Sequence, residues 1–311
     1  MKNIVVFLYL YMCCKNDGGV RGVSDEESLN YLRKYGYLEA NSMGETSQIS
    51  VSTYERSLRD FQRMVGIPVT SILDRNTQHA MKRPRCGVKD KMVSHGGLRR
   101  YAVQRSTWSI ENLTFKIWRY PTGLTQDSVD KTIQKAFDLW SEYTDLTFKP
   151  TPSKANIDIA FLRNDHEDGY PFDGREGQLA HTFLPEYGGA IHFDISEDWT
   201  IDSRDGKNLL QVAAHEIGHA LGLLHSEKCN SIMTPLYNDN LFDVKLYPDD
   251  IQRIQNLYGP KTKRSQPPIF PWFLNLPSEN PCISKLHRTH FGFSNEIPAF
   301  YFNPCILKDL N

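Results

Sequence analysis

Long uninterrupted apolar runs are scarce in this chain of 311 residues. The one that stands out follows Lys2 and extends from Ile4 to Cys14, just before Lys15. It is shorter than the roughly 20 apolar residues that a membrane-spanning helix needs. A positive residue followed by such a run is typical of a secretory signal. We therefore expect a signal peptide over residues 1–18 and no membrane-spanning helix after it; a buried N-terminal strand is the alternative.

Two further scarcities narrow the class of protein. Positive and negative residues are balanced: the chain has 36 Lys and Arg and 37 Asp and Glu, and its formal net charge is -1. Nucleic acid and anionic membranes are therefore not expected partners. Cysteine is also rare, with six residues at Cys13, Cys14, Cys86, Cys229, Cys282 and Cys305. Cysteines that are so few and so widely spaced exclude a disulfide-dense scaffold. Cys282 and Cys305 are a candidate disulfide, which would leave Cys229 as a buried free thiol.

The first part of the chain after the signal is predicted to be helical. Helical patterns cover Glu26–Tyr35, Tyr54–Val65 and Arg75–Met81, and Asp74 is a suitable N-cap for the last of them. Residues 83–100 then carry Pro, Gly and many basic residues, and end in the pair Arg99-Arg100. We assign residues 19–100 to a small helical unit with an exposed linker.

The second part mixes strands and helices. Strand patterns cover Leu113–Trp118 and Ile157–Phe161, and helix patterns cover Ser128–Tyr143, Leu209–Leu221 and Pro248–Tyr258. This mixture predicts an α+β fold, in which a sheet carries few helices. We assign residues 101–260 to this domain and residues 261–311 to a Pro-rich tail.

The strongest chemical signal is the segment His215–His225. His215 and His219 are four residues apart and share one face of a helix. Gly222 allows the chain to leave the helix sharply and bring His225 to the same point. Three histidines with an open fourth position are typical of catalytic zinc, and Glu216 is placed to take a proton from the attacking water and give it to the leaving amine. A helix that merely buries three histidines is the alternative.

Two other segments suit metal binding. Cys86, in Pro84–Asp90, offers a thiolate that can occupy the open zinc position and so silence the enzyme. Arg85 favours this thiolate and can pair with Asp90. A second group, spread over a Gly- and Asp-rich stretch, can close a four-coordinate structural site: His166, Asp168, His181 and His192. The alternative for Cys86 is a lone buried or disulfide-bonded cysteine. The alternative for the second group is a set of ordinary surface or core imidazoles.

The zinc helix, the segment Ser231–Tyr237 with Met233, and Ser226 after the third histidine resemble the matrix metalloproteinases, the matrixin branch of the metzincin zinc endopeptidases. Pro84–Asp90 is similar to the cysteine switch of their precursors, with Lys89 where Pro is usual. The resemblance covers residues 30–259. About 50 residues remain after it, too few for the hemopexin-like propeller that most of the family carries.

The resemblance implies a helical propeptide followed by a metzincin catalytic domain with a twisted, mostly parallel five-stranded sheet and three helices. It implies two zinc ions, catalytic and structural, and at least one calcium held by Asp173, Gly174, Asp194 and Glu197. A second calcium is in doubt, because Ala190, Glu186 and Asn156 replace the usual residues. Met233 would pack beneath the zinc ligands. The implied substrate-binding residues are Leu179, Ala180, Gln211, Pro235 and Tyr237.

These features predict a secreted endopeptidase that is made as a latent zymogen. It would act on extracellular matrix or other extracellular proteins, with an activating protease and protein inhibitors of metalloproteinases as partners. The competing interpretation is an inactive binding module that keeps its metals only for folding. Glu216 distinguishes the two, because only an enzyme requires it.

Overall fold

The computed structural model describes residues 22–39, 49–91, 106–201, 203, 205–239, 241 and 243–262. The expected signal peptide, the pair Arg99-Arg100, and the tail from residue 263 on, with Cys282 and Cys305, lie outside the described residues.

The N-terminal unit consists of helices α2 (Asp25–Lys34), α3 (Val51–Met64) and α4 (Arg75–Lys82). A side chain caps each helix at its N-terminus, with Ser24, Ser50 and Asp74 accepting hydrogen bonds from the first turns. Such caps satisfy backbone donors that would otherwise lack partners. Apolar residues such as Leu32 and Phe61 meet between the helices and form a small separate core. The three predicted helices are confirmed, with ends that shift by up to three residues.

The larger unit is built on a six-stranded sheet with the order β1-β5-β6-β4-β2-β3. All neighbours are parallel except β5 and β6. The strands are β1 (Arg85–Cys86), β2 (Asn112–Arg119), β3 (Thr147–Pro150), β4 (Ile157–Leu162), β5 (Gln178–Thr182) and β6 (Ile191–Asp194). The predicted sheet had five strands. The sixth is β1, which the segment after α4 adds to the edge of β5.

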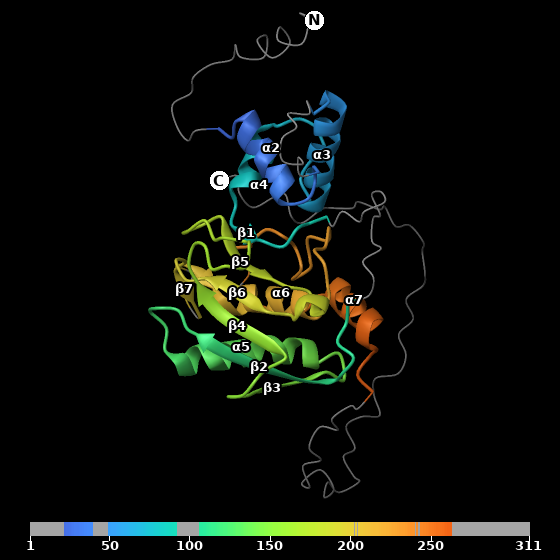
Figure 1. Ribbon diagram of the computed structural model, residues 1–311. Coiled ribbons are helices and arrows are strands. Elements are labelled where there is room, and N and C mark those ends of the chain that lie inside the picture. The colour runs from blue at the N-terminus through green and yellow to red at the C-terminus, as the bar shows by residue number, and fades with distance from the viewer. Residues whose placement is uncertain are drawn as a thin grey trace, which may run out of the picture.

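Two long helices pack together on this sheet, α5 (Gln126–Ser141) and α6 (Leu209–Ala220). Trp140 of α5 is fully buried, and its indole N–H donates to the carbonyl of Ala214 on α6 at 3.0 Å. Every residue of α6 is buried, so its polar side chains must find partners inside the protein. Figure 1 shows the helical unit stacked on the β1 end of the sheet, with α7 (Pro248–Tyr258) beside α6.

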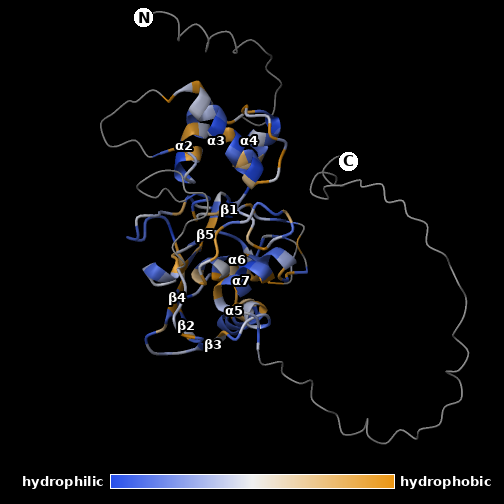
Figure 2. Ribbon diagram, turned by 90° about the vertical axis from the view of Figure 1, so that its right-hand side faces the viewer, coloured by the Kyte–Doolittle hydropathy of each residue, from blue (hydrophilic) through white to orange (hydrophobic). Residues whose placement is uncertain are grey.

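The remaining described elements are short: the 3-10 helix Pro185–Tyr187 and the strand pair β7 (Trp199–Thr200) and β8 (Lys207–Asn208). Figure 2 shows apolar segments gathered where helices and strands face each other. Within the described part of the chain, no helix combines the length and apolar character that crossing a membrane requires.

Candidate catalytic metal site

Helix α6 brings His215, Glu216 and His219 together. The ring Nε2 atoms of His215 and His219 lie 3.1 Å apart, as expected for residues one helical turn apart. The helix ends at Ala220, and Gly222 has a φ of 94°, a conformation that suits glycine. The chain turns there as predicted, and His225 comes round to place its Nε2 3.3 Å from that of His215.

The other nitrogen of each ring has a hydrogen-bond acceptor. His215 Nδ1 lies 2.7 Å from the carbonyl of Ile232, and His219 Nδ1 lies 2.7 Å from the carbonyl of Leu223. His225 Nδ1 lies 2.6 Å from a carboxylate oxygen of Asp90. These acceptors require a proton on each Nδ1, which leaves the lone pair of each Nε2 directed at the common centre.

Burial keeps the three rings neutral. It lowers the pKa of His215 to about 3, and it also lowers the pKa of His219 and His225. Nε2 of His215 lies 3.1 Å from Nε2 of His219 and 3.3 Å from Nε2 of His225, so their lone pairs repel unless a cation lies among them. Neutral imidazoles in this arrangement are the ligands of catalytic zinc, so the residues present fit the metal that the sequence predicts.

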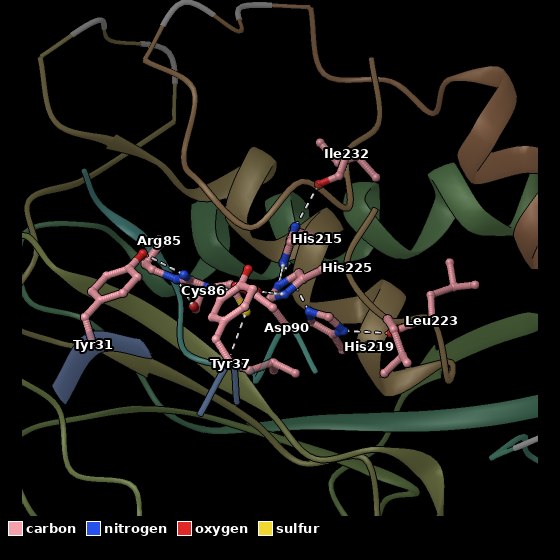
Figure 3. Close-up of polar contacts among 12 residues, drawn as sticks. Tyr31, Tyr37, Arg85, Cys86, Asp90, His215, His219, Leu223, His225 and Ile232 are labelled. Atoms are coloured by element: carbon pink, nitrogen blue, oxygen red, sulfur yellow. Dashed lines mark hydrogen bonds and ion pairs between the residues drawn. The ribbon is translucent and has the colours of Figure 1, made fainter. Parts of the chain in front are cut away.

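Cys86 lies at the same centre as the histidines. Its sulfur and one nitrogen of each ring all lie within 4.8 Å of one another, and all four residues are buried. The backbone N–H of Val88 donates to the sulfur at 3.3 Å. Figure 3 shows Cys86 and Asp90, both from the segment after α4, directed at the three rings. The structure therefore assembles the predicted four-ligand set.

Arg85 lowers the pKa of the Cys86 thiol, as predicted, but other influences on that pKa are larger. The pKa of the Cys86 thiol lies well above its usual range, because burial and the negative charge of Glu216 outweigh the nearby Arg85. Arg85 is also paired with Asp90, as predicted, at 2.6 Å and with both side chains buried. Arg85 therefore holds the loop, while deprotonating Cys86 requires the metal itself.

Glu216 is fully buried beside the metal-ligand group. Thr182 of β5 donates to its Oε2 at 2.7 Å. Burial raises the pKa of Glu216 to about 7, a value suited to a group that accepts and returns a proton near neutral pH. Sequence reasoning missed Thr182, because a threonine within a strand carries no local signal of such a contact.

Met233 is fully buried against α6. Its sulfur would be 2.3 Å from a Cβ added to Gly218, in the middle of α6. Only glycine at this position lets Met233 approach the helix so closely. The structure thus places Met233 against α6, the helix that carries His215 and His219.

The second predicted cluster is also assembled. His166 Nε2, His181 Nε2 and His192 Nδ1 each lie 2.8 Å from Oδ2 of Asp168. Burial tends to raise the pKa of Asp168, but hydrogen bonds from Tyr170 and the histidines lower it to about 2. Burial lowers the pKa of His181 to about 4. A carboxylate surrounded by three imidazoles fits a closed zinc site.

The predicted calcium ligands lie near one another but are less compact. Asp194 and Glu197 are buried, and the N–H of Gly174 donates to Asp194 at 3.2 Å. Asp173 accepts instead from the N–H of Gln178 at 2.9 Å. Oε1 of Glu197 is buried and has no hydrogen-bond partner among the described residues. This orphaned oxygen fits a cation that prefers oxygen ligands.

At the doubtful second calcium site, the side chain of Asn156 has protein partners. Its Oδ1 accepts from both the N–H and the hydroxyl of Thr114, each at 2.9 Å. Another expectation was wrong, because Cys229 is exposed rather than buried.

The predicted substrate-binding residues fall into two groups. Leu179, Gln211, Pro235 and Tyr237 line a pocket that Cys86 and Glu216 also line. With its amide oriented to satisfy both groups, Gln211 donates to the carbonyl of Asn238 at 3.0 Å and accepts from its N–H at 3.1 Å. Ala180 is not part of this lining; its carbonyl accepts from the N–H of Gly87 at 2.8 Å.

The segment after α4 forms backbone hydrogen bonds with a neighbouring segment on each side. On one side β1 pairs in parallel with β5. On the other side, the N–H of Cys86 donates to the carbonyl of Pro235 at 3.0 Å, and the N–H of Tyr237 donates to the carbonyl of Pro84 at 2.8 Å. An extended backbone is thus bound on both edges directly beside Glu216.

Comparison with known proteins agrees with this geometry. The family model described as matrixin matches residues 107–259, and the model of the peptidoglycan binding domain matches residues 27–81. Matrix metalloproteinase-15 of Homo sapiens is 37% identical over 284 residues, which are 85% of this chain and 42% of that protein.

Interstitial collagenase of Bos taurus is 42% identical over 242 residues, and that of Oryctolagus cuniculus is 43% identical over 245 residues. Each match covers 76% of this chain and 50% of the relative. The chain thus spans about half the length of the curated relatives it matches. The resemblance to matrix metalloproteinases is confirmed, and residues 107–259 form a matrixin domain, the catalytic domain of a metalloendopeptidase.

Proposed function

We propose that this chain is the latent precursor of a secreted zinc endopeptidase that hydrolyses peptide bonds in extracellular proteins. The observation that carries the proposal is the meeting of Cys86 with His215, His219 and His225 beside a buried Glu216. The residues proposed to bind the catalytic zinc are these three histidines, with Cys86 as the fourth ligand in the latent form.

The catalytic roles follow from position and charge. Zinc, when bound, supplies Lewis-acid polarisation of the scissile carbonyl and of the attacking water. Glu216 accepts a proton from that water and returns it to the leaving amine, since burial brings its pKa close to neutral pH. Thr182 orients the carboxylate through its hydrogen bond.

A polypeptide substrate is proposed to bind between β5 and the segment Pro235–Tyr237. Both edges already bind the backbone of residues 84–87, and an extended substrate can form the same type of main-chain hydrogen bonds. One of its side chains would enter the pocket lined by Leu179, Gln211 and Tyr237. Two of the relatives named above are collagenases, so collagen is a candidate substrate.

Latency is proposed to arise because the segment around Cys86 fills this groove. While it remains, the open zinc position and both substrate-binding edges are taken. An activating protease would release it, and protein inhibitors of metalloproteinases would bind the freed groove. A signal peptide over residues 1–18 would direct the chain to the extracellular space.

The two other metal sites are proposed to stabilise the catalytic domain. The cluster of His166, Asp168, His181 and His192 would hold a structural zinc, because it leaves no ligand position open. Asp173, Gly174, Asp194 and Glu197 would hold at least one calcium, which would satisfy the buried oxygen of Glu197.

The test is cleavage of a fluorogenic collagen-like peptide by the purified intact chain, before and after treatment with a thiol-reactive mercurial. Glu216→Gln and a zinc chelator provide the controls. We expect activity only after the mercurial, with none in either control. A folded, zinc-loaded chain that stays silent after removal of residues 19–100 would instead support a binding module without protease activity.

A further inference from the structure

The three histidines of the catalytic centre differ in the origin of their outer hydrogen-bond partners. His215 and His219 bind the carbonyls of Ile232 and Leu223, which belong to the catalytic domain itself. His225 binds Asp90, which lies 135 residues earlier in the chain and belongs to the propeptide. No other described residue forms a hydrogen bond with Nδ1 of His225.

The contact between His225 and Asp90 is short and fully buried. Its Oδ1 accepts from Nδ1 of His225 at 2.6 Å, and neither side chain is exposed. The same carboxylate accepts from Arg85 at 2.6 Å and, through Oδ2, from the hydroxyl of Tyr37 at 2.6 Å. Three donors from three segments therefore determine where the carboxylate lies, and it in turn determines the orientation of the His225 ring.

A carboxylate in this position has a known physical effect on a metal site. It fixes the proton on one ring nitrogen, orients the ring, and increases the basicity of the other nitrogen. Charge-assisted hydrogen bonds of this kind are also stronger than those to a neutral carbonyl. His225 would accordingly be better oriented in the precursor than a histidine whose outer partner is absent.

We propose that Asp90 is a positioning residue for the catalytic metal, acting through its hydrogen bond to His225. This rests on the proposed function, in which His225 is a zinc ligand. The propeptide then acts on the metal through two contacts: Cys86 as a direct ligand, and Asp90 through the third histidine. Removal of the propeptide takes away both.

The consequence is a difference in metal retention between the precursor and the processed enzyme. Loss of an outer partner typically weakens metal binding by about 10- to 100-fold. That loss adds to the loss of the Cys86 thiolate. The precursor would therefore retain its catalytic zinc under chelation more strongly than the processed enzyme does. The difference would be larger than the loss of the Cys86 sulfur alone explains.

The simpler interpretation is that Asp90 only neutralises Arg85 and so holds the loop that carries Cys86. The two interpretations differ once the sulfur is removed. If Asp90 acts only through the loop, its replacement has no effect on zinc affinity in a chain that lacks Cys86. If it acts through His225, the effect remains.

The experiment uses the intact chain with Cys86→Ala and Glu216→Gln in every protein, so that neither the thiolate nor self-cleavage contributes. The apparent dissociation constant of zinc is measured by competition with a chromogenic chelator. Asp90→Asn is compared with this parent and with Tyr37→Phe. Tyr37→Phe is the matched control, because it removes another hydrogen bond of the same carboxylate but leaves the His225 contact.

Zinc bound by the cluster around His166 serves as an internal reference, since Asp90 contacts none of its members. We expect Asp90→Asn to weaken zinc binding at the three-histidine site about tenfold or more and Tyr37→Phe to change it less than about threefold. Equal zinc affinity in the parent and in Asp90→Asn would overturn the inference. A parent that binds no zinc at this site would overturn the proposed function as well.

Asp90→Asn leaves Arg85 buried without a counter-charge, which can unfold the propeptide. Circular dichroism melts detect this. The comparison is then made between Arg85→Gln and the double variant Arg85→Gln with Asp90→Asn, in which no buried cation is left alone. The same tenfold difference is expected there, and its absence in folded protein would refute the positioning role.

Discussion

The buried pair of Arg85 and Asp90 allows a quantitative prediction about the docking of the segment Pro84–Asp90, which carries Cys86 and is called the latch below. Replacing Arg85 by Met keeps most of the side-chain length but removes the guanidinium. That group donates to Asp90 at 2.6 Å, to the hydroxyl of Tyr31 at 2.7 Å and to the carbonyl of Cys86 at 3.0 Å. Its central carbon also lies 3.4 Å from the ring centre of Tyr35.

The size of the effect follows from burial. Removing one partner of a buried ion pair costs about 3–5 kcal/mol. Asp90 would keep its hydrogen bonds to Tyr37 and His225, so we expect the lower end, about 3 kcal/mol. Because each 1.4 kcal/mol is about a factor of ten, the equilibrium between the docked and released latch should shift roughly 100-fold towards release.

The assay is the rate at which a thiol reagent modifies Cys86 in the intact, zinc-loaded chain, with the labelled peptide identified by mass spectrometry. Peptide cleavage by the unprocessed chain should rise in parallel. Lys34→Met is the matched control: it breaks the ion pair of Lys34 with Asp173, which is 3.5 Å long and has side chains more than 40% exposed. Such pairs contribute below about 1 kcal/mol, hence less than about a fivefold change.

Equal modification rates in Arg85→Met and Lys34→Met would refute this account, because the buried pair would then contribute no more to latching than an exposed one.

Three further predictions concern the catalytic domain. Gly218→Ala should lower the thermal midpoint by about 2–4 °C, because overpacking against Met233 outweighs the gain in helix propensity; an unchanged or higher midpoint in calorimetry would contradict this. Gln211→Leu removes the two hydrogen bonds between this side chain and the backbone of Asn238, so kcat/KM for peptides with long side chains in the pocket should rise about fivefold relative to short ones, and an unchanged ratio would count against it. Burial raises the pKa of Glu197 to about 7; since this lies above the unfolded value of 4.5, the calcium-free protein should lose stability as pH rises from about 4.5 to 7. Saturating calcium or Glu197→Gln should reduce that slope in denaturant titrations, while the contribution of the buried Glu216 remains; a slope of equal size in all three samples would disprove the assignment.

Helices were predictable from the sequence because their signals are local. Capping side chains at Ser24, Ser50 and Asp74 lie directly before the helices they start, and α7 begins at Pro248 as predicted. The strands were harder to predict. Every residue of β5 is buried, so no alternation of polar and apolar residues marks it. Strand β1 has two residues, and it exists only because a distant edge accepts it.

The candidate site divides in the same way. The spacing of His215, Glu216 and His219 specifies a shared helix face, so their convergence could be predicted. Their outer partners could not, because Ile232 and Asp90 reach the site only through the fold. The second cluster came from family resemblance as much as from spacing, since its members are spread over a loop and two strands. The net rise in the pKa of the Cys86 thiol could not be predicted, because its burial, which outweighs the charge of Arg85, has no sequence signal.

The central claim is that Cys86 closes the catalytic metal site in the intact chain. Zinc K-edge X-ray absorption of the intact, zinc-loaded protein tests it most directly, because sulfur scatters differently from nitrogen and oxygen. With two zinc sites, one holding Cys86 and the other only nitrogen and oxygen ligands, the account predicts about half a sulfur per zinc at roughly 2.3 Å, lost in Cys86→Ala. A first shell with no sulfur in the intact chain, or a sulfur shell that persists in Cys86→Ala, would contradict it.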